Sequence, residues 1–145
     1  ITMDYHIESE ELYGCEIHRF TLQPIIENAL FHGIEPKGTA GAITVSAESG
    51  TVKGKKVLKI SVTDNGIGMT RETIHSVLHE EDNPGKNKTD FFRHVGISNV
   101  NRRIQYDFGP EYGITIVSEP GVYTTMTIVR PYINQSERKK DEDLL

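Results

Sequence analysis

The sequence predicts an α+β fold, a two-layer sandwich in which a mixed, mainly antiparallel sheet carries its helices on one face. Two observations predict this class. Segments that alternate apolar and polar residues occur as neighbouring pairs along the chain, and segments with helical periodicity lie before and between those pairs. The predicted order is strand, helix, strand, strand, helix, loop, helix, strand, strand.

Five segments are predicted to be strands because apolar and polar residues alternate along them. The first is expected to lie at an edge of the sheet. A turn-rich loop over residues 49–56 is expected to join the second and third, and a turn at Glu119-Pro120-Gly121 the last two. The predicted strands cover residues 1–7, 42–47, 57–64, 112–118 and 122–129.

Three segments are predicted to be helices. Thr21 is expected to cap the first of them, with Pro24 tolerated in its first turn. Thr70 is expected to cap a short second helix, and the third is expected to begin around residues 96–99 and to stop before Gly109. The apolar side of the first helix is formed by Leu22, Ile25, Ile26, Ala29, Leu30 and Gly33.

Between the second and third helices, residues 80–94 lose all periodicity and predict a long loop. A connection of about 15 residues inside a compact domain is usually functional, often as a lid over a ligand. At the end of the chain, residues 132–145 form a charged tail that we expect to be disordered. The folded domain is therefore expected to cover residues 1–131.

Composition excludes several classes of protein. With 36% hydrophobic and 26% charged residues, the 145-residue chain resembles an ordinary soluble domain, and its net charge of -5 argues against a partner with a phosphate backbone. Cys15 is the single cysteine, so no internal disulfide can form and a reducing compartment is expected. No apolar run approaches the ~18 residues of a membrane span. The chain opens in mid-strand without Met, so we expect it to be a piece of a longer protein.

The most informative stretch is Asp64-Asn65-Gly66-Ile67-Gly68-Met69, at the end of a predicted strand. The alternation of that strand places Asp64 on its inward face, where a carboxylate costs about 1–3 kcal/mol unless hydrogen-bond donors meet it. The two glycines let the backbone turn through positive φ and approach a ligand. A hairpin turn is the alternative, but no alternating strand follows Met69. A calcium loop lacks its spaced acidic ligands here.

On the first predicted helix, Asn28 and His32 lie one turn apart on the same face, beside Gln23 and Glu27. The amide oxygen of Asn28 is a neutral ligand for a hard cation such as Mg²⁺, which prefers oxygen and keeps several waters. The alternative is a polar helix face turned to solvent.

A phosphate site is expected at the start of the third helix, because the chain contains neither of the usual glycine-rich phosphate loops. Backbone N–H groups of residues 96–99 and the positive end of the helix dipole would meet the anion, with Arg102 and Arg103 just inside. The preceding loop adds the basic residues Lys86, Lys88, Arg93 and His94. A solvated basic loop is the alternative.

Two further sets of residues could carry chemistry. Thr124, Met126 and Ile128 share one face of the last strand, so Thr124 lies at the entrance of the core and could hydrogen-bond a ligand beside Asp64, although a strand threonine is usually only structural. His75 and His79 are spaced like a metal pair, but no third ligand has a fitting position, so zinc is disfavoured.

Taken together, residues 1–131 resemble the ATP-binding catalytic domain of sensor histidine kinases, in the superfamily that includes gyrase B, Hsp90 and MutL. The LytS/YesM-like group looks most similar, and the implied architecture is the Bergerat ATP-binding fold. Four ordered motifs carry the resemblance. They are an N box over residues 22–33, a first glycine box over 64–69, a second over 96–100 with Arg103, and a closing strand motif over 121–131.

The resemblance implies how Mg²⁺ and ATP would be held. Asp64 would accept a hydrogen bond from the adenine amino group, and Thr124 would back it through water. Asn28 would ligate Mg²⁺, and a lid over residues 80–95 would fold over ATP about a hinge at Gly96. The residues implied to meet the nucleotide or metal are Asn28, His32 near the phosphates, Asp64, Gly66, Gly68 admitting the base, Met69 on the ring, Lys88, His94, Gly96, Ile97, Asn99, Arg103 and Thr124.

The chain departs from the family pattern at three positions. His94 stands where the second glycine box opens with glycine, and Tyr123 where glycine precedes the threonine. Pro24 stands where the ATP-hydrolysing relatives carry a glutamate base. Transfer to a neutral histidine needs no such base. The expected reaction is therefore transfer of the γ-phosphoryl group to a histidine.

The resemblance also implies partners and location. The acceptor histidine would lie in an upstream dimerisation domain, and a response regulator would receive the phosphoryl group in turn. This domain would be cytoplasmic, and the full-length protein would be a membrane-anchored homodimer in the bacterial cell membrane. Two other functions stay open. One is a regulatory ATP-binding module without kinase activity. The other is an anti-sigma-type protein-serine kinase, which would need Glu27 as base although it points roughly 100° away from Asn28.

Overall fold

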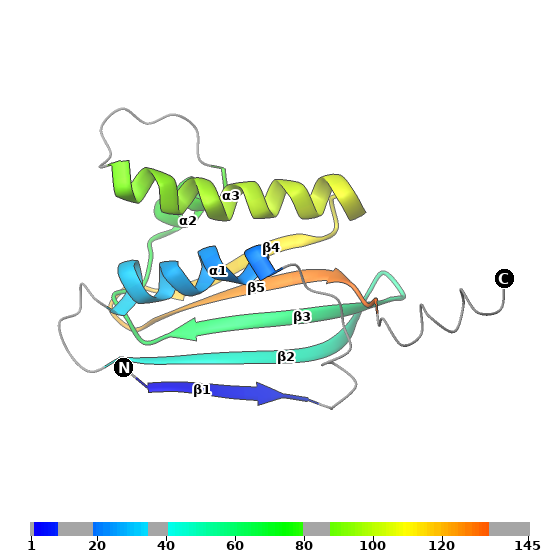
Figure 1. Cartoon of the computed structure of the whole chain (residues 1–145), viewed down its shortest axis with the longest axis horizontal. Helices are drawn as coiled ribbons and strands as arrows, with labels where there is room; N and C mark the ends of the chain where they lie inside the picture. The colour runs from blue at the N-terminus through cyan, green and yellow to red at the C-terminus, as the bar shows by residue number, and fades with distance from the viewer. Residues whose placement is uncertain (1, 9–18, 35–40, 80–87, 134–145) are drawn as a thin grey trace, which may run out of the picture.

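Five strands form one mixed sheet in the order β1-β2-β3-β5-β4 (Figure 1). The computed structural model describes residues 2–8, 19–34, 41–79 and 88–133, and for residues 19–21, 32, 33 and 88–95 it describes the backbone only. The predicted α+β sandwich is confirmed within these ranges. The lid residues 80–87 and the tail residues 134–145 lie outside them.

Strand pairing in the sheet is antiparallel except at one edge. β1 (Thr2–Ile7) runs parallel to β2 (Ala42–Val52), which confirms the predicted edge strand. β3 (Lys55–Asp64) pairs with β2 and with β5 (Tyr123–Pro131), and β4 (Gly113–Glu119) closes the other edge beside β5. β3 is therefore the central strand, and its end carries Asp64.

The hairpin between β2 and β3 is longer and tighter than predicted. Pairing continues to Val52 opposite Lys55, so the expected loop over residues 49–56 is wrong. The turn consists of Lys53 and Gly54, with φ of 50° and 78°. Positive φ at both positions gives a turn whose twist matches that of the strands. The hairpin end extends past the helices (Figure 1), so neither face there needs the apolar residues that mark a strand.

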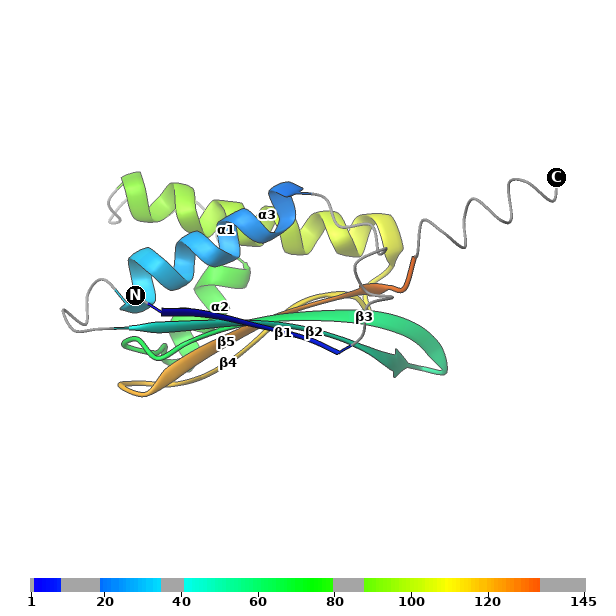
Figure 2. The same cartoon turned by 60° about the horizontal axis from the view of Figure 1, so that its bottom comes forward.

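The helices lie on one face of the sheet, as Figure 2 shows. α1 (Arg19–Asn28) passes directly into a π-helical turn, η2 (Ala29–Ile34). α1 begins before Thr21, so the predicted cap is wrong and Pro24 lies inside the helix rather than in its first turn. The short α2 (Arg71–Leu78) is confirmed, because the Thr70 side chain accepts a hydrogen bond from the Thr73 N–H at 3.2 Å.

The third helix, α3 (Lys88–Phe108), begins well before the predicted residues 96–99. Part of the predicted loop is thus helical, since no proline interrupts residues 88–95 and their polar residues are compatible with a helix. The N–H groups of residues 96–99 are then inside the helix and bonded to carbonyls one turn earlier. They do not form the free helix terminus that we expected to bind phosphate. The predicted end before Gly109 is confirmed.

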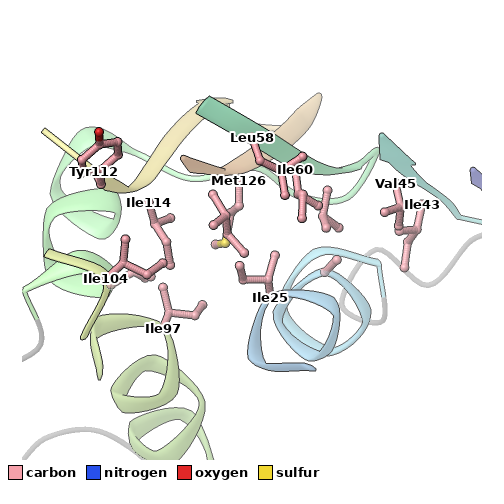
Figure 3. Close-up of a cluster of buried hydrophobic side chains, with 14 of the residues drawn as sticks. Ile25, Ile43, Val45, Leu58, Ile60, Ile97, Ile104, Tyr112, Ile114 and Met126 are labelled. Carbon is pink, nitrogen blue, oxygen red and sulfur yellow. The ribbon is translucent and has the colours of Figure 1, made fainter. Parts of the chain in front are cut away.

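The core lies between the sheet and the helix layer (Figure 3). Ile25 of α1 and Ile97 of α3 point toward Met126 and Ile60 of the sheet, and all four are at most 3% exposed. Ala29 is buried as well, and Leu22, Ile26 and Leu30 pack against this core, which confirms most of the predicted apolar side of the first helix. Each large aliphatic side chain buried in this way contributes about 1.5–3 kcal/mol to the stability of the fold. The strand ends that carry the site are therefore held by a well-packed core.

Candidate nucleotide site

Asp64 is the last residue of β3 and is only 2% exposed, as the alternation of the strand predicted. Its Oδ1 accepts a hydrogen bond from the Gly66 N–H at 2.9 Å, which supplies one of the donors that a buried carboxylate requires. Asn65 connects the loop to β2, because its Oδ1 accepts a hydrogen bond from the Ala42 N–H at 2.9 Å. The chain then continues into α2, so the alternative of a hairpin turn here is wrong.

The glycine loop, residues 64–69, is fastened to the turn between β4 and β5. The Ile67 carbonyl accepts a hydrogen bond from the Gly121 N–H at 2.6 Å. Gly68 has φ of 72°, and a Cβ at this position would overlap the Glu119 carbonyl oxygen. The need for glycine at this position therefore comes from a contact within the chain, which the sequence did not indicate.

Replacing Gly68 by alanine should destabilise the domain by more than about 2 kcal/mol, because strain at positive φ adds to the overlap with Glu119. Gly121 is the matched control, since its φ is 81° but a Cβ there meets nothing within 4 Å. Gly121→Ala should lower the free energy of unfolding by only about 1–2 kcal/mol, because the strain of positive φ is the sole cost at this position. Urea denaturation of both variants measures the difference. Equal losses would contradict the tight packing inferred at Gly68.

Thr124 lies directly opposite Asp64 in the pairing of β3 with β5, and it is 2% exposed. Its predicted position beside the acid is confirmed. On its other side, Ser118 of β4 is paired with Thr124, and the two hydroxyl oxygens are 2.8 Å apart. Ser118 also accepts from the Met69 N–H at 2.7 Å. Ser118 was not among the predicted site residues, because only the observed register of β4 with β5 places it opposite Thr124.

Asn28 is the last residue of α1 and is 1% exposed, so the alternative of a solvated helix face is wrong for this side chain. Its Oδ1 is buried and has no hydrogen-bond partner among the residues that the structure describes. A buried acceptor without a donor costs about 1–3 kcal/mol. A bound cation would satisfy this oxygen, and amide oxygens are ligands that Mg²⁺ accepts. The side chain of His32, in η2, lies outside the description.

The elements that carry these residues end on the same side of the molecule. η2 contacts β3 and β5, and Figure 1 shows the end of α1, the tip of β3 and the turn between β4 and β5 at the same end of the sandwich. Asn28 on the helix layer thus lies above the sheet end that carries Asp64 and Thr124. Met69, at 8% exposure, ends the glycine loop there.

The remaining predicted residues lie on α3 and are not brought together in the same way. Ile97 is fully buried in the core, while Asn99 and Arg103 are exposed. Gly96 lies inside the helix, where a Cβ would come within 3.3 Å of the Pro24 side chain of α1. Gly96 thus allows the two helices to approach. Lys88 and His94 belong to the same helix, with side chains that are not described.

The described residues contain no group of three or more His, Cys, Asp or Glu side chains that could hold a metal ion. The rings of His75 and His79 lie next to each other, with centroids 4.7 Å apart and planes tilted by 46°. Within the described ranges, no helix is long and apolar enough to cross a membrane.

The fold and the site together match the expected class of ATP-binding domains, with a buried acid at the tip of the central strand and a buried amide at the end of a helix. The family model described as histidine kinase-, DNA gyrase B-, and HSP90-like ATPase matches residues 18–134. The chain belongs to this family. The expected resemblance to sensor histidine kinases is thereby confirmed at the level of the family and the fold.

The chain is also similar in sequence to curated sensor kinases. The chain is 33% identical over 126 residues to sensor histidine kinase YesM of Bacillus subtilis (strain 168), covering 87% of this chain and 19% of YesM. It is 30% identical over 128 residues to sensor histidine kinase BtsS of Escherichia coli (strain K12), covering 88% and 19%. Sensor protein LytS of Staphylococcus saprophyticus is 31% identical over 132 residues, covering 88% and 20%. The chain thus spans about a fifth of the length of these relatives.

Solved structures show the same fold. The full-length ShkA structure in complex with AMPPNP matches 92% of this chain and 26% of ShkA, with a TM-score of 0.63 and 14% sequence identity. The catalytic domain of histidine kinase ThkA, in a nucleotide-free form, matches 90% of this chain and 78% of that domain, with a TM-score of 0.56 and 16% identity. The expected fold class is confirmed by this likeness.

Proposed function

We propose that this chain is the Mg-ATP-binding catalytic domain of a two-component sensor histidine kinase, and that it presents the γ-phosphoryl group of ATP to a histidine in an upstream dimerisation domain. One observation carries the proposal. A carboxylate that is 2% exposed stands at the tip of the central strand, tied to a glycine loop and paired with a buried threonine. Membership of the family and the names of the relatives support the same assignment.

The base would be recognised at the sheet end of the site. Asp64 has only acceptor atoms when ionised, so it selects a ligand with a hydrogen-bond donor, such as the amino group of adenine. Gly66 holds the carboxylate in place through its N–H at 2.9 Å. Met69 adds an apolar side chain beside it, suited to the face of a purine ring.

The phosphates would lie toward the helix layer. The Oδ1 of Asn28, which has no hydrogen-bond partner among the described residues, fits a magnesium ligand, and His32 follows one turn later in η2. Bound Mg²⁺ would supply charge neutralisation for the phosphoryl oxygens. Asn28 would orient the metal and, through it, the phosphate chain. The basic residues Lys88, His94 and Arg103 of α3, with Asn99, are proposed to face the same phosphates when the nucleotide is bound.

Transfer to a histidine fits this site better than hydrolysis or transfer to a serine. Pro24 has no acid or base and packs against Gly96 of α3. The neighbouring carboxylate, Glu27, accepts a hydrogen bond from Gln23 Nε2 at 3.0 Å and is thus engaged on the helix surface. A neutral imidazole brings its own nucleophilic lone pair, so the domain needs only to bind and position the nucleotide.

The longer protein is proposed to supply the remaining parts. These are the phosphoacceptor histidine in a dimerisation domain, a response regulator that receives the phosphoryl group, and a membrane anchor that leaves this domain in the cytoplasm of a homodimer. This part of the proposal rests on the relatives, of which the chain covers about a fifth.

The function is tested in two stages. Calorimetric titration of the domain with ATP should give saturable binding that strengthens when Mg²⁺ is added, while the domain alone incorporates no phosphate from γ-labelled ATP. The full-length protein should then label its acceptor histidine. Binding without any transfer in the full-length protein would indicate a regulatory ATP module instead. Transfer to serine that is lost in Glu27→Gln would indicate a serine kinase, and absence of saturable binding would refute the proposal altogether.

A further inference from the structure

The Ser118 hydroxyl in β4 is a junction of three hydrogen bonds. The Met69 N–H donates to its oxygen at 2.7 Å, and the same oxygen donates to the Tyr123 carbonyl at 2.6 Å. The third contact joins it to Thr124 Oγ1 at 2.8 Å. Ser118 therefore links the glycine loop to the buried threonine that stands opposite Asp64.

The direction of the third hydrogen bond follows from the other two. A serine hydroxyl has one hydrogen and two lone pairs. A carbonyl can only accept, so the hydrogen of Ser118 goes to Tyr123. An amide N–H can only donate, so Met69 occupies one lone pair. One lone pair of Ser118 is left for Thr124, and Thr124 must donate its own hydrogen to fill it.

Thr124 is thereby left with acceptor capacity alone. Its neighbour across the strand pair, Asp64, also has only acceptors when ionised, and both side chains are 2% exposed. Two acceptors cannot bond to each other. A ligand that contacts both side chains therefore has to offer hydrogen-bond donors, either from an amino group or from a water molecule that the amino group holds.

We propose that Ser118 is a specificity-determining positioning residue, which takes the Thr124 hydrogen and so makes the site select purines that carry an amino group at position 6. This inference rests on the proposed ATP site. Without Ser118, Thr124 could turn its hydrogen to Asp64 and occupy the acceptor that the amino group needs. Discrimination would then fall, although Asp64 and Thr124 are both still present.

The test compares ATP with purine riboside triphosphate, which lacks the 6-amino group. The ratio of their dissociation constants is measured by calorimetry on the intact chain. In Ser118→Ala the preference for ATP should fall about tenfold, the loss expected when one hydrogen bond to a charged group is compromised. Ser118→Thr, which keeps the hydroxyl, should restore it. In a Thr124→Val background, Ser118→Ala should change the ratio no further.

Ser61→Ala is the matched control. Ser61 Oγ also bonds to a threonine on the next strand, Thr127 Oγ1 at 2.9 Å, but on the other face of the sheet. Ser61→Ala should leave the ratio of the two dissociation constants unchanged. NMR provides a readout independent of binding, since the buried Thr124 hydroxyl proton should be slow to exchange in the parent and fast in Ser118→Ala.

The outcomes separate the two proposals. An unchanged ratio in Ser118→Ala, with ATP still bound and Asp64→Asn still harmful, would overturn the role of Ser118 and leave the ATP site intact. A parent chain that binds neither nucleotide would overturn the ATP site and this inference with it.

Discussion

Replacing Asp64 by asparagine is expected to weaken ATP binding by about 100-fold, the equivalent of ~3 kcal/mol. Asparagine keeps an oxygen that can accept from the Gly66 N–H, as Asp64 does at 2.9 Å, so the glycine loop should hold its shape. What changes is the second half of the side chain, where an NH₂ donor would face the amino group of adenine. Two donors repel, and the negative charge that strengthens the hydrogen bond is gone.

Calorimetry with Mg-ATP measures this effect, and circular dichroism checks that the fold is kept. Asp107→Asn is the matched control, because Asp107 is exposed near the end of α3, so the same charge is removed away from the site. Its affinity should equal that of the parent. A dissociation constant for Asp64→Asn within about threefold of the parent would show that this carboxylate does not bind the base.

Replacing Asn28 by leucine is expected to act in opposite directions on stability and on binding. The Oδ1 of Asn28 is buried without a described partner, so an apolar side chain of similar size should raise the free energy of unfolding by about 1 kcal/mol. The same change removes the proposed magnesium ligand. The gain in ATP affinity that Mg²⁺ produces over EDTA should therefore disappear.

Asn101 is a control of the same residue type, for which replacement by leucine is expected to lower stability and not to raise it. It is 5% exposed, and its Oδ1 accepts a hydrogen bond from the Ile114 N–H at 2.8 Å. Asn101→Leu should lower the free energy of unfolding by about 1–3 kcal/mol, because it leaves a buried N–H unpaired, and it should not alter the dependence on Mg²⁺. If Asn28→Leu destabilised the domain as much as Asn101→Leu, the oxygen of Asn28 would have an unrecognised partner in the folded protein.

Strand alternation is the part of the sequence that predicted the site best. A period of two fixes which face a residue occupies, so Asp64 and Thr124 could be placed inward before any pairing was known. Asn28 was harder, because helical periodicity grouped it with polar residues, whereas the structure buries it at 1% exposure. Polarity indicates exposure to solvent on average, and this rule fails where the fold buries a polar side chain, as it does at Asn28.

The errors have a common physical origin. Residues 88–95 and 49–52 are polar in composition, and sequence patterns assign such segments to loops even when backbone hydrogen bonds continue through them. The structural reason for glycine at position 68 depends on the Glu119 carbonyl, which belongs to a distant part of the chain. Contacts of this kind, like the role of Ser118, follow from the register of strands and not from local sequence.

The fastening of residues 64–69 has a consequence for the thermodynamics of binding. Hydrogen bonds from Asn65 to Ala42, from Met69 to Ser118 and from Gly121 to Ile67 already hold this loop from three strands or turns. The proposed base site is thus preorganised, and little conformational entropy would be lost there on binding of a purine. In the proposed site, base recognition and phosphate binding depend on separate parts of the fold, so that a mutation can alter one of them without changing the other.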